Sequence, residues 1–230
     1  MNRLIGILLC LFALPMHAGA LDWPVIESPP KSRVQWVGQD MKLNGVPMRI
    51  QQFSSGASVG EVLNYYRALW GNMAEKKSVE KTVGKRQTIG KWVGEYYLSI
   101  QVQPDGLTSS SGYMVINKMV QKKDVVSSQH NFPVMPGGSF YSELESNDPG
   151  QTATTITMLN QASVDSNADF FKGRLAAQDW KLDKQYGGPQ QNGAAHALFF
   201  RRDKQEAMVI VSKNAQGTSV VANVLAHTGK

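Results

Sequence analysis

The chain is 230 residues long, carries a formal net charge of +6 and contains one cysteine, Cys10. A single cysteine excludes internal disulfide bonds and zinc sites built from several cysteines. The length allows two domains of about 100 residues, each large enough to be held by its own core. The mild positive charge suits anionic partners, although solvated strand and turn faces more commonly produce such a balance.

The first twenty residues have the pattern of a secretory signal peptide. Arg3 supplies the positive charge, residues 4–14 form an apolar stretch of eleven residues, and Ala18-Gly19-Ala20 is a small-x-small cleavage site. A membrane-spanning helix needs about twenty apolar residues, so an uncleaved anchor is the less favoured alternative. We therefore expect cleavage after Ala20, export to a bacterial periplasm, and no membrane span in the mature chain.

The mature chain is expected to begin with an extended segment and a hairpin. Leu21–Ser32 contains three prolines, which favour extended structure. Two strand-like runs follow, Val34–Leu43 and Pro47–Phe53, and the second alternates apolar and polar residues as a half-buried strand does. Between them lies Asn44-Gly45, a strong signal for an antiparallel hairpin with a tight turn.

A helix is predicted directly after this hairpin. Ser58 is a favourable N-cap residue, and Glu61 completes a capping box. Apolar residues then recur at helical spacing and form one stripe, which indicates a helix lying on a sheet. They are Val59, Val62, Leu63, Tyr66, Leu69, Trp70 and Met73. The charged stretch Glu75–Lys81 is interpreted as a polar connection, and strand-like runs follow at 87–93, 95–103 and 111–120.

The helical segment occurs a second time, 105 residues further along the chain. Ser58–Arg67 aligns without a gap with Ser163–Lys172, and each copy contains an aromatic pair followed by a basic residue. The second stripe consists of Val164, Ala168, Phe171 and Leu175. Strand-like runs lie at 139–145, 152–160, from Trp180 onward, and at 194–202, 206–212 and 218–226. Solenoid repeats have periods of about 20–50 residues, so this longer spacing predicts two copies of a small domain.

These patterns predict an α+β protein formed by tandem duplication of a ββαβββ unit. Each unit is expected to be one antiparallel sheet with one helix packed on it. The predicted organisation is a signal peptide over 1–20, an extended segment over 21–32, domains over 33–120 and 139–230, and a linker over 121–138. The linker is charged and then rich in serine, proline and glycine, as domain boundaries often are. We expect each copy to fold on its own.

The aromatic pairs Tyr65-Tyr66 and Phe170-Phe171 are expected to divide between core and surface. Consecutive helical residues point about 100° apart, so both members of a pair cannot face one core. Tyr66 and Phe171 fall on the apolar stripe, whereas Tyr65 and Phe170 lie at its flank and are candidates for a partner-binding surface. The alternative is that they only cover a sheet edge. The predicted structural stripe comprises Val62, Tyr66, Leu69, Trp70, Phe171 and Leu175.

Residues that could carry out chemistry are few. The histidines after the leader show neither metal-ligand spacing nor a Gly-x-Ser-x-Gly nucleophile motif nearby; they are His130, His196 and His227. His196 is interpreted as a partly buried strand residue. The carboxylate pairs each lie on one element and are interpreted as solvated faces, not as a glycosidase pair; they are Glu143/Glu145 and Asp165/Asp169. We therefore expect no catalytic residue, no metal site and no cofactor.

The sequence thus predicts an exported, periplasmic, non-enzymatic binding or assembly protein, such as an accessory component of a secretion or pilus system. The expected partner is another envelope protein, joined by strand addition at a sheet edge, or an anionic surface or polymer. Nucleic acid is not expected. The alternative is a module that binds a ligand or cell-wall polymer in a groove between the two domains. A hydrolase that uses His196 is the least favoured prediction.

Overall fold

The computed structural model describes residues 23–71, 79–119, 132–188 and 195–227. The first half contains β1 (Ser32–Leu43), β2 (Val46–Ser55), α1 (Val59–Trp70), β3 (Val79–Val83), β4 (Arg86–Val93), β5 (Tyr96–Pro104) and β6 (Ser110–Lys118). The second half contains β7 (Ser139–Asp148), β8 (Gln151–Asn160), α2 (Val164–Ala176), β9 (Lys181–Gly187), β10 (Ala195–Arg202), β11 (Gln205–Asn214) and β12 (Gly217–His227). The predicted leader and most of the predicted linker, including His130, lie outside these residues.

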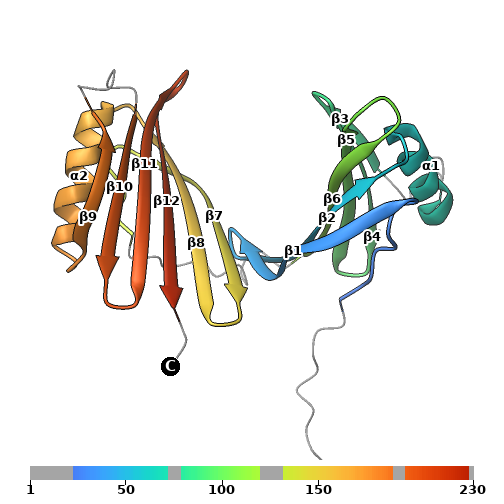
Figure 1. The fold of residues 1–230 in the computed structure, drawn as a ribbon, viewed down its shortest axis with the longest axis horizontal. Coiled ribbons are helices and arrows are strands. Elements are labelled where there is room, and N and C mark those ends of the chain that lie inside the picture. The colour runs from blue at the N-terminus through green and yellow to red at the C-terminus, as the bar shows by residue number, and fades with distance from the viewer. Residues whose placement is uncertain (1–22, 72–78, 120–131, 189–194, 228–230) are drawn as a thin grey trace, which may run out of the picture.

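All the strands join in one antiparallel sheet, in the order β3-β4-β5-β6-β2-β1-β7-β8-β12-β11-β10-β9 (Figure 1). Strand accounts for 61% and helix for 14% of the described residues, so the protein is mostly β. The predicted α+β class with two separate ββαβββ sheets is therefore wrong. One reason is that β1 pairs with β7, which merges the sheets of the two halves.

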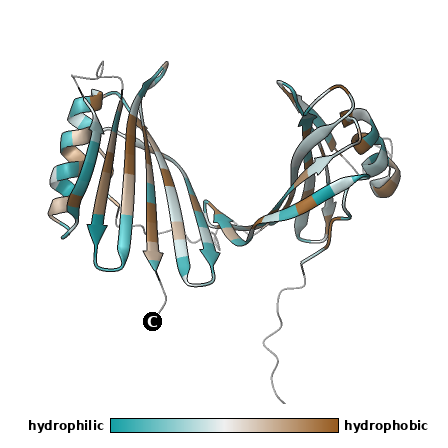
Figure 2. Cartoon of the chain, in the orientation of Figure 1, coloured by the Kyte–Doolittle hydropathy of each residue, from teal (hydrophilic) through white to brown (hydrophobic). Residues whose placement is uncertain are grey.

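The second reason is that each helix is followed by four strands instead of three. β3 falls partly within the charged stretch that we interpreted as a connection, and β9 is likewise mostly hydrophilic (Figure 2). Both are the outermost strands of the sheet. Edge strands commonly carry charged residues that prevent further pairing, so they lack the apolar pattern of inner strands.

The beginnings of both helices follow from their N-cap residues. Ser58 accepts a hydrogen bond from the Glu61 amide, and the Glu61 carboxylate accepts one from the Ser58 amide at 2.7 Å, which confirms the predicted capping box. Ser163 caps α2 in the same way through the Ser166 amide. The Asn44-Gly45 hairpin is also confirmed, with both residues at positive φ and Leu43 paired with Val46.

Each helix covers its own half of the sheet and buries a separate core. The first core gathers Val62, Tyr66 and Trp70 of α1 with side chains from β2, β4, β5 and β6. The second gathers Phe171 and Leu175 of α2 with side chains from β8, β10, β11 and β12. Leu69 departs from the predicted stripe: it is 40% exposed, because the arc that faces the sheet runs through Val62, Leu63, Tyr66 and Trp70 instead.

The two halves meet at a short ladder between β1 and β7. Met41, Lys42 and Leu43 pair with Ser146, Glu145 and Leu144, and Asn44 continues the contact through hydrogen bonds of 2.8 Å to the backbone of Glu143. The Lys42 ammonium lies 3.0 Å from the Glu145 carboxylate. The pairing of β1 with β2 is irregular between Trp36 and Met41, directly before the residues that pair with β7. The prediction that each copy folds on its own stays a prediction.

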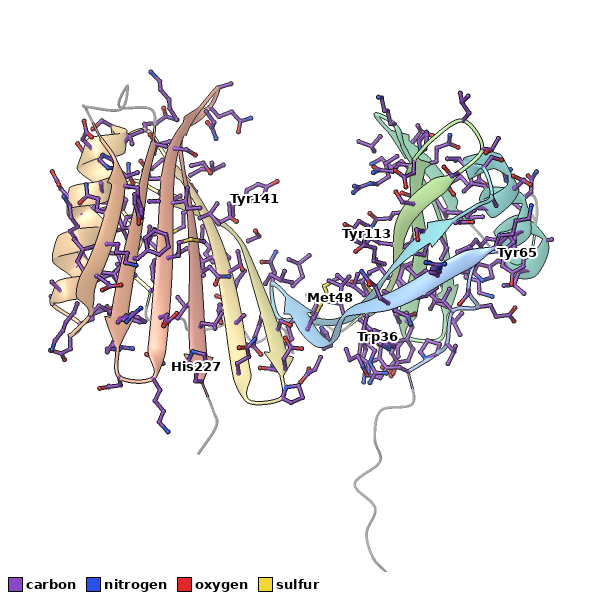
Figure 3. All side chains as sticks on the ribbon, in the orientation of Figure 1. Trp36, Met48, Tyr65, Tyr113, Tyr141 and His227 are labelled. Carbon is purple, nitrogen blue, oxygen red and sulfur yellow. The ribbon has the colours of Figure 1, made fainter. Side chains whose placement is uncertain are left out.

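The face of the sheet opposite the helices, here called the helix-free face, continues across the junction. Leu43 and Leu144 are paired there, and Leu144 packs with Met41, Met48 and Val115 on the side away from both helix cores. α1 and α2 lie at opposite ends of the molecule (Figure 1). Tyr113 and Tyr141 point toward each other from the two halves across this face (Figure 3).

The Lys42–Glu145 pair is expected to make the junction sensitive to acid. The hydrogen bond from Lys42 holds the pKa of Glu145 below its usual value of 4.5. A carboxylate with a lowered folded-state pKa stabilises the fold fully above the unfolded pKa, and this contribution is lost as the pH falls through the folded value. We expect Glu145→Gln to lower the urea midpoint at neutral pH, and the wild type and variant midpoints to converge below pH 4.5. Lys42→Gln should behave in the same way; a midpoint difference that persists in acid would contradict the prediction.

Candidate ligand-binding pocket

A short segment with one sequence pattern leads into each half of the sheet. It reads Trp23-Pro24-Val25-Ile26 before β1 and Phe132-Pro133-Val134-Met135 before β7. Trp23 packs against the first core, and Phe132 packs against the second. Each aromatic ring therefore packs against the core of its own half, and the part of the core next to the ring is here called the core end.

In the first half this end is covered by two aromatic rings. Trp23 contacts Tyr96, the first residue of β5, at a ring-centroid distance of 5.3 Å, and Tyr96 is 8% exposed. The Arg49 guanidinium lies 4.7 Å from the Trp23 ring and donates from Nε to the Gln39 carbonyl at 3.0 Å. Aromatic side chains each bury a large area, and Trp23 and Tyr96 lie together at this core end.

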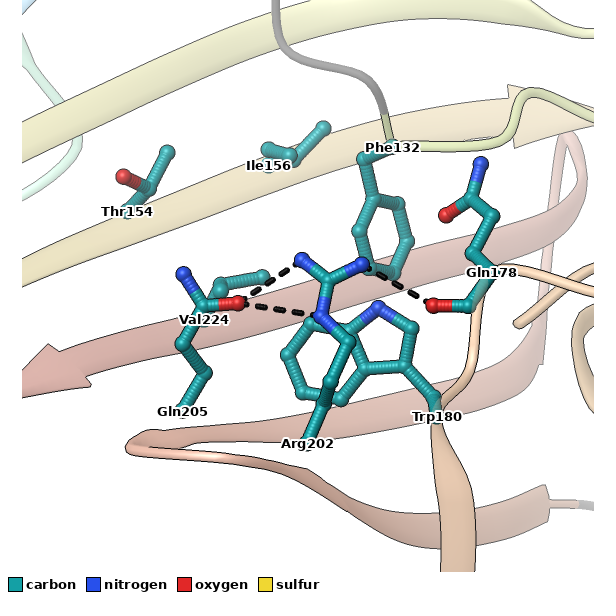
Figure 4. Close-up of a pocket in the computed structure, with 8 residues that line it drawn as sticks. All are labelled: Phe132, Thr154, Ile156, Gln178, Trp180, Arg202, Gln205 and Val224. Atoms are coloured by element: carbon teal, nitrogen blue, oxygen red, sulfur yellow. Dashed lines mark hydrogen bonds between the residues drawn. The ribbon is translucent and has the colours of Figure 1, made fainter. Parts of the chain in front are cut away.

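In the second half the corresponding end is hollow. Gln205, the first residue of β11, takes the position that Tyr96 has in the first half. Gln205 follows the two-residue turn after β10, and Tyr96 follows the two-residue turn after β4. Phe132 takes the place of the larger Trp23. A cavity of about 430 Å³ is lined here by Phe132, Thr154, Ile156, Gln178, Trp180, Arg202, Gln205 and Val224 (Figure 4). This volume lies within the range of small-molecule sites, about 300–1,000 Å³.

The C-terminal turn of α2 places Trp180 in the wall of this pocket. Asp179 adopts a left-handed conformation with φ of 65°, and the Trp180 amide donates to the Leu175 carbonyl at 3.0 Å. This is a Schellman-type helix end, which reverses the chain direction abruptly. Trp180 is consequently 5% exposed and lies against the second core.

Arg202, at the end of β10, is held flat over Trp180 by neutral acceptors (Figure 4). Its guanidinium carbon lies 4.5 Å from the Trp180 ring. Nε and Nη2 donate to Gln205 Oε1 at 3.2 and 2.7 Å, and Nη1 donates to the Gln178 carbonyl at 3.0 Å. Among the eight lining residues, Arg202 is the one charged side chain. The pocket therefore combines apolar walls with one oriented cation.

The two flank aromatics predicted as a partner surface lie on the helices, away from this pocket. Tyr65 is half-buried, and its hydroxyl donates to the Glu27 carboxylate at 3.0 Å, so it holds the leading segment onto α1. Desolvation and the hydrogen bond with Glu27 both raise the pKa of the Tyr65 hydroxyl. Phe170 is half-buried, contacts Phe171 edge-on, and lies 5.7 Å from the Arg174 guanidinium. A partner-binding role for either residue stays a prediction.

His196 has an acidic neighbour that its sequence position does not reveal. Its Nε2 lies 2.7 Å from Asp165 Oδ1 in the first turn of α2, and Gln185 lies 3.4 Å from Nδ1. His196 is 4% exposed, so its interpretation as a partly buried residue underestimated its burial. Neither ring nitrogen contacts a serine, threonine or cysteine among the described residues. The pair joins α2 to the sheet.

The predicted carboxylate pairs differ in their exposure. Glu143 is 4% exposed, so the interpretation of Glu143 and Glu145 as a solvated face is wrong for this residue: it lies opposite Ile156 on the side of the sheet that α2 covers. Asp165 and Asp169 are both exposed on α2, and Lys172 lowers the pKa of Asp169 by hydrogen bonding to it. Among the described residues, no cluster of His, Cys, Asp and Glu side chains is arranged to hold a metal ion.

Neither helix in the described part of the chain has the length and apolar character that crossing a membrane requires. We compared the chain with protein-family models, with curated proteins and with solved structures, and no match was found in any of the three comparisons.

Proposed function

We propose that this protein is an exported, non-enzymatic binding protein of the bacterial envelope whose second half binds a small organic ligand in the Arg202 pocket. The observation that carries the proposal is the difference between two halves with the same order of elements. Trp23 and Tyr96 cover the core end in the first half, whereas Phe132 and Gln205 leave about 430 Å³ in the second. Concave, mostly apolar sites with a few convergent polar groups are the usual binding sites for small molecules.

The side chains of the pocket favour binding over catalysis. A general base or nucleophile must lie within hydrogen-bond reach of the reacting atom. The eight described lining residues include no histidine, carboxylate, lysine or serine, and their one hydroxyl belongs to Thr154. Export, a periplasmic location and an accessory role in a secretion or pilus system remain predictions from the sequence.

Filling the pocket with the residues of the first half tests this function. We expect wild type to bind the neutral fluorescent probe N-phenyl-1-naphthylamine saturably, at one site per chain. Phe132→Trp combined with Gln205→Tyr should weaken binding by at least about tenfold, because the added ring atoms occupy the space in which the probe buries apolar surface. The measurement is a fluorescence titration.

A matched control places the same Gln→Tyr change outside the pocket. Gln101 is half-buried on β5, on the helix-free face, and Gln101→Tyr should leave probe binding unchanged. Thermal unfolding would establish that both variants are folded. Equal probe affinity in the folded double variant and in wild type would refute the proposed pocket.

A further inference from the structure

We propose that the ligand of the Arg202 pocket is a carboxylic acid with an apolar body, whose carboxylate pairs with the Arg202 guanidinium. This inference rests on the proposed function and adds the chemical class of the ligand. It is carried by the hydrogen bonds and the charge of Arg202, together with the apolar character of the surrounding wall.

Arg202 brings a positive charge into the pocket. Arginine stays protonated in proteins and has five N–H donors. Arg202 donates three hydrogen bonds, and both accepting oxygens are neutral: the Gln205 side-chain amide oxygen and the Gln178 backbone carbonyl. Within the described part of the chain no carboxylate contacts the guanidinium, whereas its neighbour Arg201 lies within 4 Å of both Asp183 and Glu206. Among the described residues nothing else accepts from Arg202, so the pocket offers one positive charge and two N–H donors to a ligand.

The geometry of the Arg202 guanidinium suits a carboxylate. A planar guanidinium offers parallel N–H groups that match the two oxygens of a carboxylate, and such charge-assisted pairs are about twice as strong as neutral hydrogen bonds. Trp180 and the two glutamines already fix the plane of Arg202, so little side-chain freedom remains to be lost when a ligand binds. A single carboxylate balances the single charge, whereas a phosphate dianion would leave an excess negative charge against apolar walls.

The walls of the pocket suit an apolar ligand body. Phe132, Ile156 and Val224 line the cavity with apolar surface, and Trp180 adds its ring beside Arg202 (Figure 4). Phe132 is fixed by stacking on Phe171 at 5.9 Å. An aliphatic or aromatic group that follows the carboxylate would bury its surface against these residues. The pocket thus fits an amphipathic monoanion, for which a medium-chain fatty acid is a simple probe.

The experiment compares decanoate with decan-1-ol, which shares the alkyl chain but carries no charge. Each is titrated against wild type preloaded with N-phenyl-1-naphthylamine. Decanoate should displace the probe at a concentration at least about tenfold lower than decan-1-ol, the ratio expected of a hydrogen bond to a charged group. Arg202→Gln should bring the ratio of the two displacing concentrations, decan-1-ol over decanoate, to near one. Arg202→Lys keeps the charge but loses the parallel N–H groups of the guanidinium, and should give an intermediate ratio.

A matched arginine in the first half serves as the control. Arg49 also lies over a tryptophan, but it covers Trp23 outside the pocket. Arg49→Gln should therefore leave the decanoate-to-decanol ratio of wild type unchanged. If the Arg202→Gln variant is folded, as judged by thermal unfolding, and keeps the wild-type ratio, the carboxylate inference is overturned.

The remaining outcomes separate this inference from the proposed function. Equal displacement by decanoate and decan-1-ol would leave a ligand pocket without an anion site, so the inference would fail and the function would stand. Tighter binding of decyl phosphate than of decanoate would replace the carboxylate with a phosphate ester and overturn the stated class. Failure of wild type to bind the neutral probe at all would remove the proposed function itself.

Discussion

Replacing Phe171 or Tyr66 with alanine is expected to destabilise the protein by about 3–5 kcal/mol. Both rings are fully buried, Phe171 in the second core and Tyr66 in the first. Removing either ring forfeits its transfer free energy and leaves a cavity that the surrounding helix and sheet can only partly close. The Tyr66 hydroxyl also donates to the Glu27 carbonyl at 2.6 Å, so Tyr66→Phe separates this hydrogen bond from the loss of the ring. Guanidinium unfolding curves give each free energy.

The neighbouring aromatics provide the comparison. Tyr65 and Phe170 are half-buried at the edges of the same cores, and Tyr65→Ala and Phe170→Ala should each cost clearly less than the change at the adjacent residue. Burial is the reason, because the transfer term scales with the apolar area removed from water. Flank variants that lose more stability than Tyr66→Ala and Phe171→Ala would show that the helices are rotated on the sheet relative to this structure.

The features predictable from the sequence are those that nearby residues decide. The Asn44-Gly45 turn and the Ser58–Glu61 capping box each depend on residues within four positions of one another, so local geometry suffices. The apolar stripe placed Tyr66 and Phe171 in the two cores. It failed at Leu69, because a spacing pattern gives the direction of a helix face only to within a residue, and the sheet decides where that face ends.

The merged sheet depends on contacts that no local pattern encodes. β1 and β7 pair across about 100 residues of chain through only three register pairs, so neither strand carries a local signal of its partner. β3 was harder still to predict, whereas the strand-like run predicted from Trp180 onward is present as β9. The charged residues of β3 are favourable at a sheet edge and equally favourable in a loop, so the sequence supports both interpretations.

The pocket left one signal in the sequence that could have been found. The pattern of an aromatic residue, proline and valine occurs before each half, and its two copies differ in the size of the aromatic residue, Trp23 against Phe132. The remaining parts come from separate elements. Arg202, Trp180 and Gln205 converge only because the end of α2 turns sharply and β10 pairs with β11. Long-range pairing also explains the contact of His196 with Asp165.

A buried pair of asparagines in the second half carries the other large expected effect. Asn160 and Asn167 are 6% and 0% exposed and exchange amide hydrogen bonds of 2.8 and 2.9 Å. The Asn160 side chain also accepts from the Ala162 amide at 3.0 Å. Asn167→Val removes the acceptor of the Asn160 NH₂ group inside the core. We expect a loss of about 1–3 kcal/mol, the cost of an unsatisfied buried polar group.

The first half shows how the same site is built without this pair. Ser55 and Val62 occupy the equivalent positions, and the Ser55 hydroxyl accepts from the Ala57 amide at 3.0 Å, as Asn160 does from Ala162. Asn160→Ser together with Asn167→Val should therefore recover most of the stability that Asn167→Val loses, because no unpaired amide remains. A double-mutant cycle of urea unfolding measures the coupling, which is about 0.5–3 kcal/mol for residues in one hydrogen-bond network. If the two substitutions were additive, the amide pair would contribute no coupling, and the packing of valine in the second core would have to explain the loss.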